Sequence, residues 1–174
     1  MSDLKVFQDG FEIKTIVYLL RINKKGKKEV LLAKHRKQGK WNGFGGKVGD
    51  KDEWKNETIE MGATREGEEE LGIIASDLKN RAIIDFLFYS GDEFTKVQGH
   101  VFFTSKWKGK IVGIGMDSPT WFQIDEIPWD EMWTNDRAWL EQLLLSDKFL
   151  EAIYEFNKGD NKGEKAFEKS FIWK

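Results

Sequence analysis

The segment Gly45–Ile73, GGKVGDKDEWKNETIEMGATREGEEELGI, decides the fold of this chain and carries its chemistry. Thr58 has a side chain that caps the amino ends of helices, and a glycine such as Gly72 commonly follows the last helical residue. We therefore expect a helix over residues 58–71. Its last two turns carry charged side chains where an ordinary surface helix continues an apolar stripe, and this departure indicates a functional role.

Three acidic residues, Glu66, Glu69 and Glu70, stand at i, i+3 and i+4 of this helix and share one face. Like charges at this spacing destabilise a helix by roughly a few tenths of a kcal/mol for each pair, so the arrangement favours a bound cation. With no histidine or cysteine nearby, carboxylate oxygens suit a hard ion, Mg²⁺ or Mn²⁺. The alternative is a solvated acidic face, which is the commoner meaning of a charge run.

The surrounding residues resemble the Nudix box, a family pattern written G-x5-E-x7-R-E-U-x-E-E-x-G-U in which U is a bulky aliphatic residue. The matching residues are Glu57, Arg65, Glu66, Glu69, Glu70, Gly72 and Ile73. The resemblance implies that Arg65 orients the helix by pairing with Glu57. Ten residues separate Gly46 from Glu57 where the family has five, so we interpret residues 50–55 as an insertion that lengthens the loop. Gly67 replaces the first U residue, and glycine inside a helix costs about 1 kcal/mol relative to alanine.

The segment Trp41–Lys47, WNGFGGK, resembles the residues that precede the box in MutT-type members of the family. The resemblance implies that Gly46 offers its carbonyl oxygen to the metal ion and that Asn42 contacts a purine base. Taken alone, glycines that alternate with aromatic residues fit an ordinary turn equally well.

A basic cluster at residues 34–36, KHR, lies shortly before this turn. Positive charge upstream of an acidic, metal-binding helix could face a polyphosphate, and the alternative is a solvated strand end. We expect Lys34 and Lys47 to bind the substrate.

A later segment, Trp121–Trp133, WFQIDEIPWDEMW, resembles the branch of the family that hydrolyses oxidised purine nucleoside triphosphates. The resemblance implies that Trp133 stacks on the purine and that Asn135 and Asp136 hydrogen-bond its edge. Those relatives carry two aspartates at these positions, whereas an amide offers a fixed donor and a fixed acceptor, so we expect this chain to accept fewer kinds of base. Taken alone, Trp133 fits a core residue and Asp136 fits a helix cap.

Together these resemblances imply Mg²⁺-dependent hydrolysis, with Mn²⁺ as a substitute, of oxidised purine nucleoside triphosphates such as 8-oxo-dGTP to the monophosphate and pyrophosphate. Such a reaction cleans the nucleotide pool and prevents DNA damage. The residues implied to be catalytic are Glu66, Glu69 and Glu70, which also hold the metal ion together with the carbonyl of Gly46. The alternatives are a Nudix hydrolase of another nucleoside diphosphate derivative and a catalytically weak nucleotide-binding module.

The rest of the chain is expected to form strands and one further helix. The β-rich runs cover residues 12–22, 28–35, 81–90, 97–107 and 119–124, with a short β-like tail at 166–173. The turn at 23–26 predicts a hairpin between the first two strands. Apolar residues over 139–154 recur at helical spacing and predict one long helix that begins at Asn135 or Asp136 and runs to about Phe156. The resemblance implies an α/β Nudix fold, a mixed β-sheet sandwiched between α-helices.

Composition limits the class of protein. The 174 residues, 40% of them hydrophobic, suffice for one substantial core, and we expect a single Nudix hydrolase domain over residues 1–174. A formal net charge of −2 gives no basic footprint for polymeric nucleic acid. No cysteine, signal peptide or membrane-spanning apolar run is visible. We therefore expect a cytoplasmic monomer that acts on a small-molecule nucleotide and has no membrane partner.

Overall fold

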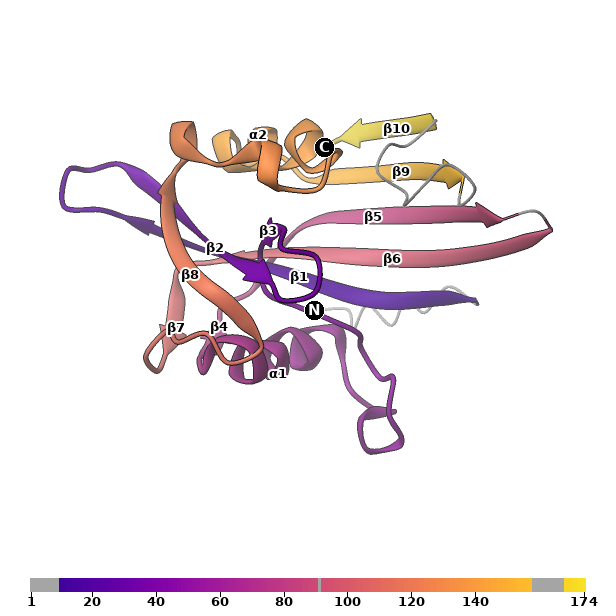
Figure 1. Ribbon diagram of the computed structural model, residues 1–174, viewed down its shortest axis with the longest axis horizontal. Coiled ribbons are helices and arrows are strands. Elements are labelled where there is room, and N and C mark those ends of the chain that lie inside the picture. Colours follow the sequence, from indigo (N-terminus) through magenta and orange to yellow (C-terminus); the bar gives the residue numbers. More distant parts are fainter. Residues whose placement is uncertain (1–9, 91, 158–167) are drawn as a thin grey trace.

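The structure, a computed structural model, describes residues 10–90, 92–157 and 168–174. Its centre is one large β-sheet with a helix on each face (Figure 1). The strands of this sheet are β1 (Phe11–Ile22), β2 (Lys28–His35), β3 (Trp41–Asn42), β5 (Lys79–Ser90), β6 (Glu93–Thr104), β8 (Met116–Gln123), β9 (Leu150–Asn157) and β10 (Glu168–Trp173). A smaller sheet pairs β4 (Ile74–Ser76) with β7 (Lys106–Lys108), and the helices are α1 (Ile59–Leu71) and α2 (Asp136–Leu145).

The large sheet is mixed, with the strand order β10-β9-β5-β6-β1-β2-β3 and β8 also paired to β2. β1 runs parallel to β6 and β5 runs parallel to β9, whereas the other neighbouring pairs are antiparallel. β1 and β2 form the predicted hairpin, and β5, β6 and β8 begin a few residues before their predicted starts. The tail predicted at 166–173 is β10, although residues 166 and 167 lie outside the described residues.

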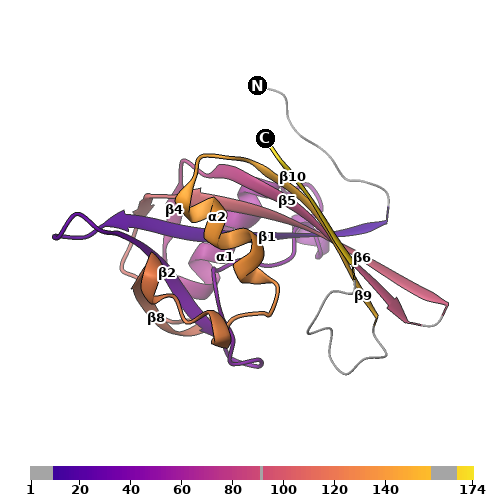
Figure 2. The ribbon, with the colours of Figure 1, turned by 90° about the horizontal axis from the view of Figure 1, so that it is seen from above.

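The two helices cover the same part of the sheet from opposite faces. They lie on opposite sides of the sheet in Figure 1 and overlap in projection near β1 in Figure 2. This arrangement confirms the predicted α/β architecture, a mixed sheet between helices. Neither helix of the described chain is long and apolar enough to cross a membrane.

Two hydrophobic cores lie on the two faces because side chains alternate along β1. Tyr18 belongs to the buried cluster under α2, with its ring centroid 6.3 Å from that of Trp139. Val17 belongs to the cluster under α1, together with Ala63 of that helix. Fully burying a large apolar side chain stabilises a fold by about 1.5–3 kcal/mol, so these contacts fix both helices to the central strand.

The long helix predicted to reach Phe156 is wrong, because α2 ends at Leu145 and residues 150–157 form β9. The buried residues of β9 are Leu150, Ala152, Tyr154 and Phe156. They recur every second residue, which is the period of a strand. Ile153 is 41% exposed between them, and its apolar side chain is what makes the sequence pattern resemble a helix.

The end of α2 is fixed by Arg81 of β5. Nη2 of this guanidinium donates hydrogen bonds to the carbonyl oxygens of Leu143, Ser146 and Lys148 at 3.3, 2.6 and 3.0 Å. Carbonyl groups at a helix end lack intrahelical partners and carry partial negative charge, so a cation satisfies them well. The Arg81 contacts therefore favour a chain that leaves the helix and enters the sheet as β9.

Candidate active site

Helix α1 forms almost as predicted. Thr58 precedes it with extended backbone, and its hydroxyl oxygen accepts a hydrogen bond from the backbone N–H of Met61 at 3.2 Å. Gly72 follows the helix with a φ of 68°, a conformation that glycine adopts without strain. Residues 65–70 therefore lie in regular helical turns, which place the three carboxylates on one face.

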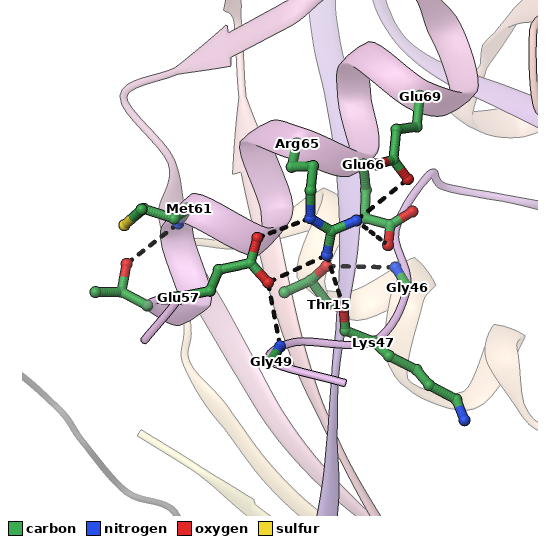
Figure 3. Close-up of polar contacts among 10 residues, drawn as sticks. Thr15, Gly46, Lys47, Gly49, Glu57, Met61, Arg65, Glu66 and Glu69 are labelled. Atoms are coloured by element: carbon green, nitrogen blue, oxygen red, sulfur yellow. Dashed lines mark hydrogen bonds and ion pairs between the residues drawn. The ribbon is translucent and has the colours of Figure 1, made fainter. Parts of the chain in front are cut away.

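Arg65 is the hub of the polar contacts beside α1 (Figure 3). Its Nε and Nη2 donate to the two carboxylate oxygens of Glu57 at 2.7 and 3.1 Å, which confirms the predicted pair. Nη2 also donates to the carbonyl oxygen of Lys47 at 2.8 Å, and Nη1 donates to Glu66 and Glu69 at 2.9 and 3.2 Å. These charge-assisted bonds tie the helix to the loop that precedes it.

The insertion at residues 50–55 turns back over this hub. It contains one 3-10 turn, Asp52–Trp54, and the Trp54 ring lies 3.8 Å from the guanidinium carbon of Arg65. Nζ of Lys51 lies 3.9 Å from the same ring. A cation facing an indole ring is stabilised by about 0.5–2 kcal/mol. The insertion thus does more than lengthen the loop, because it packs on the residue that organises the carboxylates.

Two of the carboxylates, Glu66 and Glu70, are partly buried. Burial raises the pKa of Glu70 to about 7, against the effect of a hydrogen bond at 2.9 Å from the backbone N–H of Gly45. Burial also raises the pKa of Glu66, despite its contacts with Arg65. Carboxylates whose ionised form is disfavoured by burial gain most from a nearby positive charge.

These carboxylates, with nearby backbone oxygen, form an oxygen-only donor set of the kind that suits a hard divalent cation. A Cβ built on Gly46 would lie 2.4 Å from Oε1 of Glu66, so the loop backbone lies directly against the carboxylate. The Gly46 carbonyl accepts a hydrogen bond from the backbone N–H of Thr15 at 2.8 Å, which leaves one lone pair. The residues that could hold a cation are Glu66, Glu69, Glu70 and the carbonyl of Gly46.

The carboxylates are not drawn together, and among the described residues no group of three or more His, Cys, Asp or Glu side chains is arranged to ligate a metal ion. Arg65 holds Glu66 and Glu69, whereas the backbone N–H of Gly45 holds Glu70. A cation bound here would have to replace the guanidinium as the partner of the first two carboxylates.

Gly67, which departs from the box pattern, lies where a side chain would be tightly packed. A Cβ built on it would come within 3.0 Å of the Ile73 carbonyl oxygen and 3.2 Å of the Phe44 ring. Phe44 is fixed in turn by backbone hydrogen bonds with Val17 at 2.7 and 3.1 Å. The close approach of this ring to the helix accounts for the glycine, which the sequence alone leaves unexplained.

A cavity of about 520 Å³ opens between the loop after β3, the sheet and the segment before α2. The predicted site residues that line it are Asn42, Gly46, Lys47, Trp133, Asn135 and Asp136. The carboxylates of α1 adjoin it at the backbone of Gly45 and Gly46. Lys34 does not line the cavity, because its Nζ binds Glu131 at 2.9 Å and lies 4.8 Å from the centre of the Trp41 ring.

Two side chains at the cavity wall have defined hydrogen-bonding states. Oδ1 of Asn42 accepts hydrogen bonds from the Tyr18 hydroxyl at 2.7 Å and the Gly43 N–H at 2.8 Å, so its Nδ2 remains to donate. Asp136 is 7% exposed, and burial raises its pKa to about 7, against a smaller lowering effect of the Trp139 indole. Neither Oδ2 of Asp136 nor Nε1 of Trp139 has a hydrogen-bond partner of normal geometry. Asn135 occupies the position before α2 without forming a side-chain cap, and Asp136 is the first residue of the helix.

Other lining residues are absent from the sequence-based predictions. Phe156 forms an aromatic wall with Phe88 and Phe86, at ring-centroid distances of 5.0 and 6.4 Å. The alternation of Phe86 and Phe88 along a predicted strand is the sequence signal for these two residues, whereas Phe156 lies at the end of the segment predicted to be the long helix. A Cβ on Gly99 would lie 3.2 Å from the Phe86 ring, so the absence of a side chain at Gly99 gives this ring its space. Lys14 of β1 also lines the cavity.

Comparison with known sequences supports the resemblance drawn above. The sequence pattern of the NUDIX domain matches residues 13–143. The oxidized purine nucleoside triphosphate hydrolase of Danio rerio is 38% identical over 112 residues, which are 64% of this chain and 67% of that protein. The protein of the same name from Mus musculus is 39% identical over 111 residues, again 64% of this chain and 67% of the relative.

Comparison with solved structures supports the fold. The MutT protein from Bacillus halodurans matches with a TM-score of 0.74 at 18% identity, over 92% of this chain and 97% of that one. A MutT NUDIX hydrolase from Burkholderia pseudomallei matches with a TM-score of 0.54 at 23% identity, over 67% of this chain and 86% of that one. At these identities the likeness confirms the predicted fold and says nothing further about activity.

Proposed function

The chain belongs to the Nudix family of pyrophosphohydrolases, and from this premise we propose that it hydrolyses oxidised purine nucleoside triphosphates of the 8-oxo-dGTP type to the monophosphate and pyrophosphate. One observation carries the proposal. A single cavity has Asn42, Trp133 and Asp136 in its lining, and Gly46 in the same lining lies against the carboxylates of α1. The names of the fish and mouse relatives support the same substrate class.

In this proposal the purine is bound by Asn42, Trp133 and Asp136. Nδ2 of Asn42 donates to the base, because its Oδ1 is already occupied by Tyr18 and Gly43. Trp133 stacks on the purine, and the unpartnered Oδ2 of Asp136 gains the hydrogen bond that it lacks in the protein alone. A buried polar group without a partner costs about 1–3 kcal/mol, so a base that satisfies Asp136 is favoured over one that does not.

Asn135 is the proposed reason for a narrower choice of base. Its amide presents a fixed donor and a fixed acceptor, whereas a second carboxyl could gain or lose a proton to suit different purines. We expect a clear preference for 8-oxo-dGTP over 2-hydroxy-dATP, measured as kcat/KM for each. Comparable efficiency on the two nucleotides would contradict this reading, and Asn135→Asp is expected to bring the two values closer together.

The cofactor in this proposal is Mg²⁺, with Mn²⁺ as a substitute, held by the acidic face of α1. When bound, the ion neutralises charge on the phosphates and lowers the pKa of a coordinated water. The ligands would be Glu66, Glu69, Glu70 and the Gly46 carbonyl. Arg65 keeps two of the carboxylates near the loop through its bonds to Glu57, and either Glu66 or Glu69 accepts the proton of the attacking water.

The substrate is thus a small nucleotide rather than a nucleic-acid polymer, and we expect the enzyme to act as a cytoplasmic monomer that cleans the nucleotide pool. The test is pyrophosphate release in Mg²⁺ from 8-oxo-dGTP and from dGTP, side by side. We expect kcat/KM to be at least about tenfold higher for the oxidised nucleotide, the size that one additional satisfied hydrogen bond provides. Equal or absent turnover of both would overturn the proposal and direct attention to other nucleoside diphosphate derivatives.

A further inference from the structure

Three charged side chains meet at the edge of the cavity, and they come from two segments of the chain. Oε1 of Glu12 lies 3.1 Å from Nζ of Lys14, and Oε2 of the same carboxylate lies 2.7 Å from Nζ of Lys47. Lys14 and Lys47 are paired across an antiparallel bridge between β1 and the loop after β3. Opposed residues of such a bridge project to the same side, so one carboxylate spans both ammonium groups.

The two lysines face the cavity rather than the carboxylates of α1. Both line it, together with Ile16 and Val97. The backbone oxygen of Lys47 accepts a hydrogen bond from Arg65 at 2.8 Å, and its side chain points away from that guanidinium (Figure 3). Lys47 therefore belongs to both parts of the site, since its backbone is fixed to the Arg65 hub and the residue is part of the cavity lining.

The charges at this edge do not balance. One carboxylate faces two ammonium groups, which leaves a net charge of +1 for Glu12, Lys14 and Lys47 together. Burial acts to raise the pKa of Glu12, but the hydrogen bonds from Lys47 and Lys14 outweigh it and hold the pKa below its usual value. His35, which also lines the cavity, has its pKa lowered by burial and by Lys14, so its protonated form is disfavoured there.

A structural role explains this cluster poorly. The side chains are 36–47% exposed, and exposed ion pairs contribute only about 0–1 kcal/mol to stability. Among the described residues that line the cavity, Lys14 and Lys47 are the lysines, and the lining contains no arginine. An anionic group that enters the cavity has these two ammonium groups as its cationic partners.

We propose that Lys14 and Lys47 together bind the phosphate chain of the nucleotide, with Glu12 holding them in place beforehand, so that Lys14 rather than Lys34 is the second lysine of the substrate site. The inference rests on the proposed function for the identity of the nucleotide. Lysine binds phosphate as a compact point charge and needs no planar pairing geometry. Lys47 directly follows Gly46, the proposed metal ligand, and pairs with Lys14 across the bridge, so both lysines lie near the phosphates that the metal ion would hold.

The experiment compares four proteins: wild type, Lys14→Met, Lys14→Arg and Lys24→Met. Lys24 is an exposed lysine in the β1–β2 turn, away from the cavity, and serves as the matched control. KM and kcat are measured for 8-oxo-dGTP in Mg²⁺, and binding of inorganic tripolyphosphate and of the nucleoside 8-oxo-deoxyguanosine is measured by titration calorimetry. Thermal unfolding of each protein shows whether the fold is retained.

We expect Lys14→Met to raise KM and the tripolyphosphate dissociation constant by about tenfold, the size of one charge-assisted hydrogen bond, with kcat changed by less than about twofold. Nucleoside binding should stay the same, Lys14→Arg should recover most of the affinity, and Lys24→Met should match wild type. The proposal is overturned if Lys14→Met matches the control, if wild type does not bind tripolyphosphate, or if the nucleoside and tripolyphosphate lose affinity equally. Should wild type fail to hydrolyse 8-oxo-dGTP, the proposed function falls while the tripolyphosphate titrations still decide the role of Lys14.

Discussion

Glu70 is expected to contribute to catalysis but not to the stability of the fold. Its Oε2 accepts the Gly45 N–H, and burial raises its pKa to about 7, so its ionised form is costly without a cation. Glutamine keeps an oxygen acceptor at this position but removes the charge. We expect Glu70→Gln to lower kcat by about 10²–10³-fold, the size of the effect of one key electrostatic group. The variant should be at least as stable as wild type at neutral pH, because glutamine removes the charge that burial disfavours.

The measurement is steady-state hydrolysis in Mg²⁺ together with chemical denaturation of the same preparations. Glu68→Gln is the control, because Glu68 lies on the same helix with an exposed side chain. Full activity of the Glu70→Gln protein would show that Glu70 is not a metal ligand or catalytic group.

Asp136 makes stability depend on pH. Burial raises its pKa from the usual 3.8 to about 7, so over this interval the folded protein holds a proton that the unfolded chain releases. The contribution to stability is complete below the unfolded value and is lost as the pH rises through about 7. Asparagine cannot ionise, so we expect Asp136→Asn to exceed wild type in stability at pH 8, by up to about 4 kcal/mol at 1.36 kcal/mol per pKa unit.

Denaturant unfolding of Asp136→Asn and wild type at pH 5, 6.5 and 8 tests this prediction. The difference should grow in favour of the variant as the pH rises. A difference that is the same at all three values would mean that Asp136 does not titrate in this interval in the folded protein.

Single residues differ in how far the sequence predicts their contacts. The family pattern alone predicts the pair of Glu57 and Arg65, and the structure contains it. Gly67 could not be explained from the sequence, since its neighbours, Phe44 and the Ile73 carbonyl, are set by tertiary packing. The place of Lys34 shortly before the glycine-rich turn predicts that it binds the substrate, yet Lys14 lines the cavity and Lys34 does not.

At the scale of elements, the insertion at residues 50–55 supports the Arg65 hub. Trp54 packs 3.8 Å from the guanidinium, and a contact of this kind contributes about 0.5–2 kcal/mol. We expect Trp54→Ala to destabilise the protein by about that amount and Trp54→Phe to recover a large part of it, because a phenyl face also attracts a cation. The free energy of unfolding of the three proteins from denaturant titration checks this.

A double variant provides the control. Arg65→Ala removes one of the two cations that face the ring and leaves Lys51, so adding Trp54→Ala to it should cost less than Trp54→Ala alone. Equal costs in the two backgrounds would mean that Trp54 stabilises the loop through other contacts. Such a result would mean that the insertion does not support Arg65, and through it the carboxylates of α1.

The sequence predicts α1 correctly but predicts a helix where β9 lies. The sequence predicts α1 well because Thr58 and Gly72 mark its two ends. The segment after α2 has apolar residues that suit both a helix and a strand, and no glycine or proline separates the two elements. The choice is made by partners distant in sequence, Arg81 at the helix end and the parallel pairing with β5.

At the scale of the whole molecule, the family match ends at residue 143, whereas the sheet continues through β9 and β10. β9 lies between β5 and β10, and it supplies Phe156 to the cavity wall. Phe171 and Trp173 of β10 pack against the core under α2. We therefore propose that these strands belong to the same domain as the matched region, as the prediction of a single domain requires.

Two truncated chains test this last point. A chain that ends at Asn157 keeps β9 and loses β10, so we expect lower stability with substrate turnover retained. A chain that ends at residue 147 exposes the edge of β5 and removes Leu150, Tyr154 and Phe156 from the core. Removing three such large buried side chains forfeits several kcal/mol, comparable to the whole stability of a domain, so this chain should not unfold cooperatively or turn over substrate. Calorimetric unfolding and pyrophosphate release measure both effects, and wild-type behaviour of the shorter chain would mean that the matched region folds and acts alone.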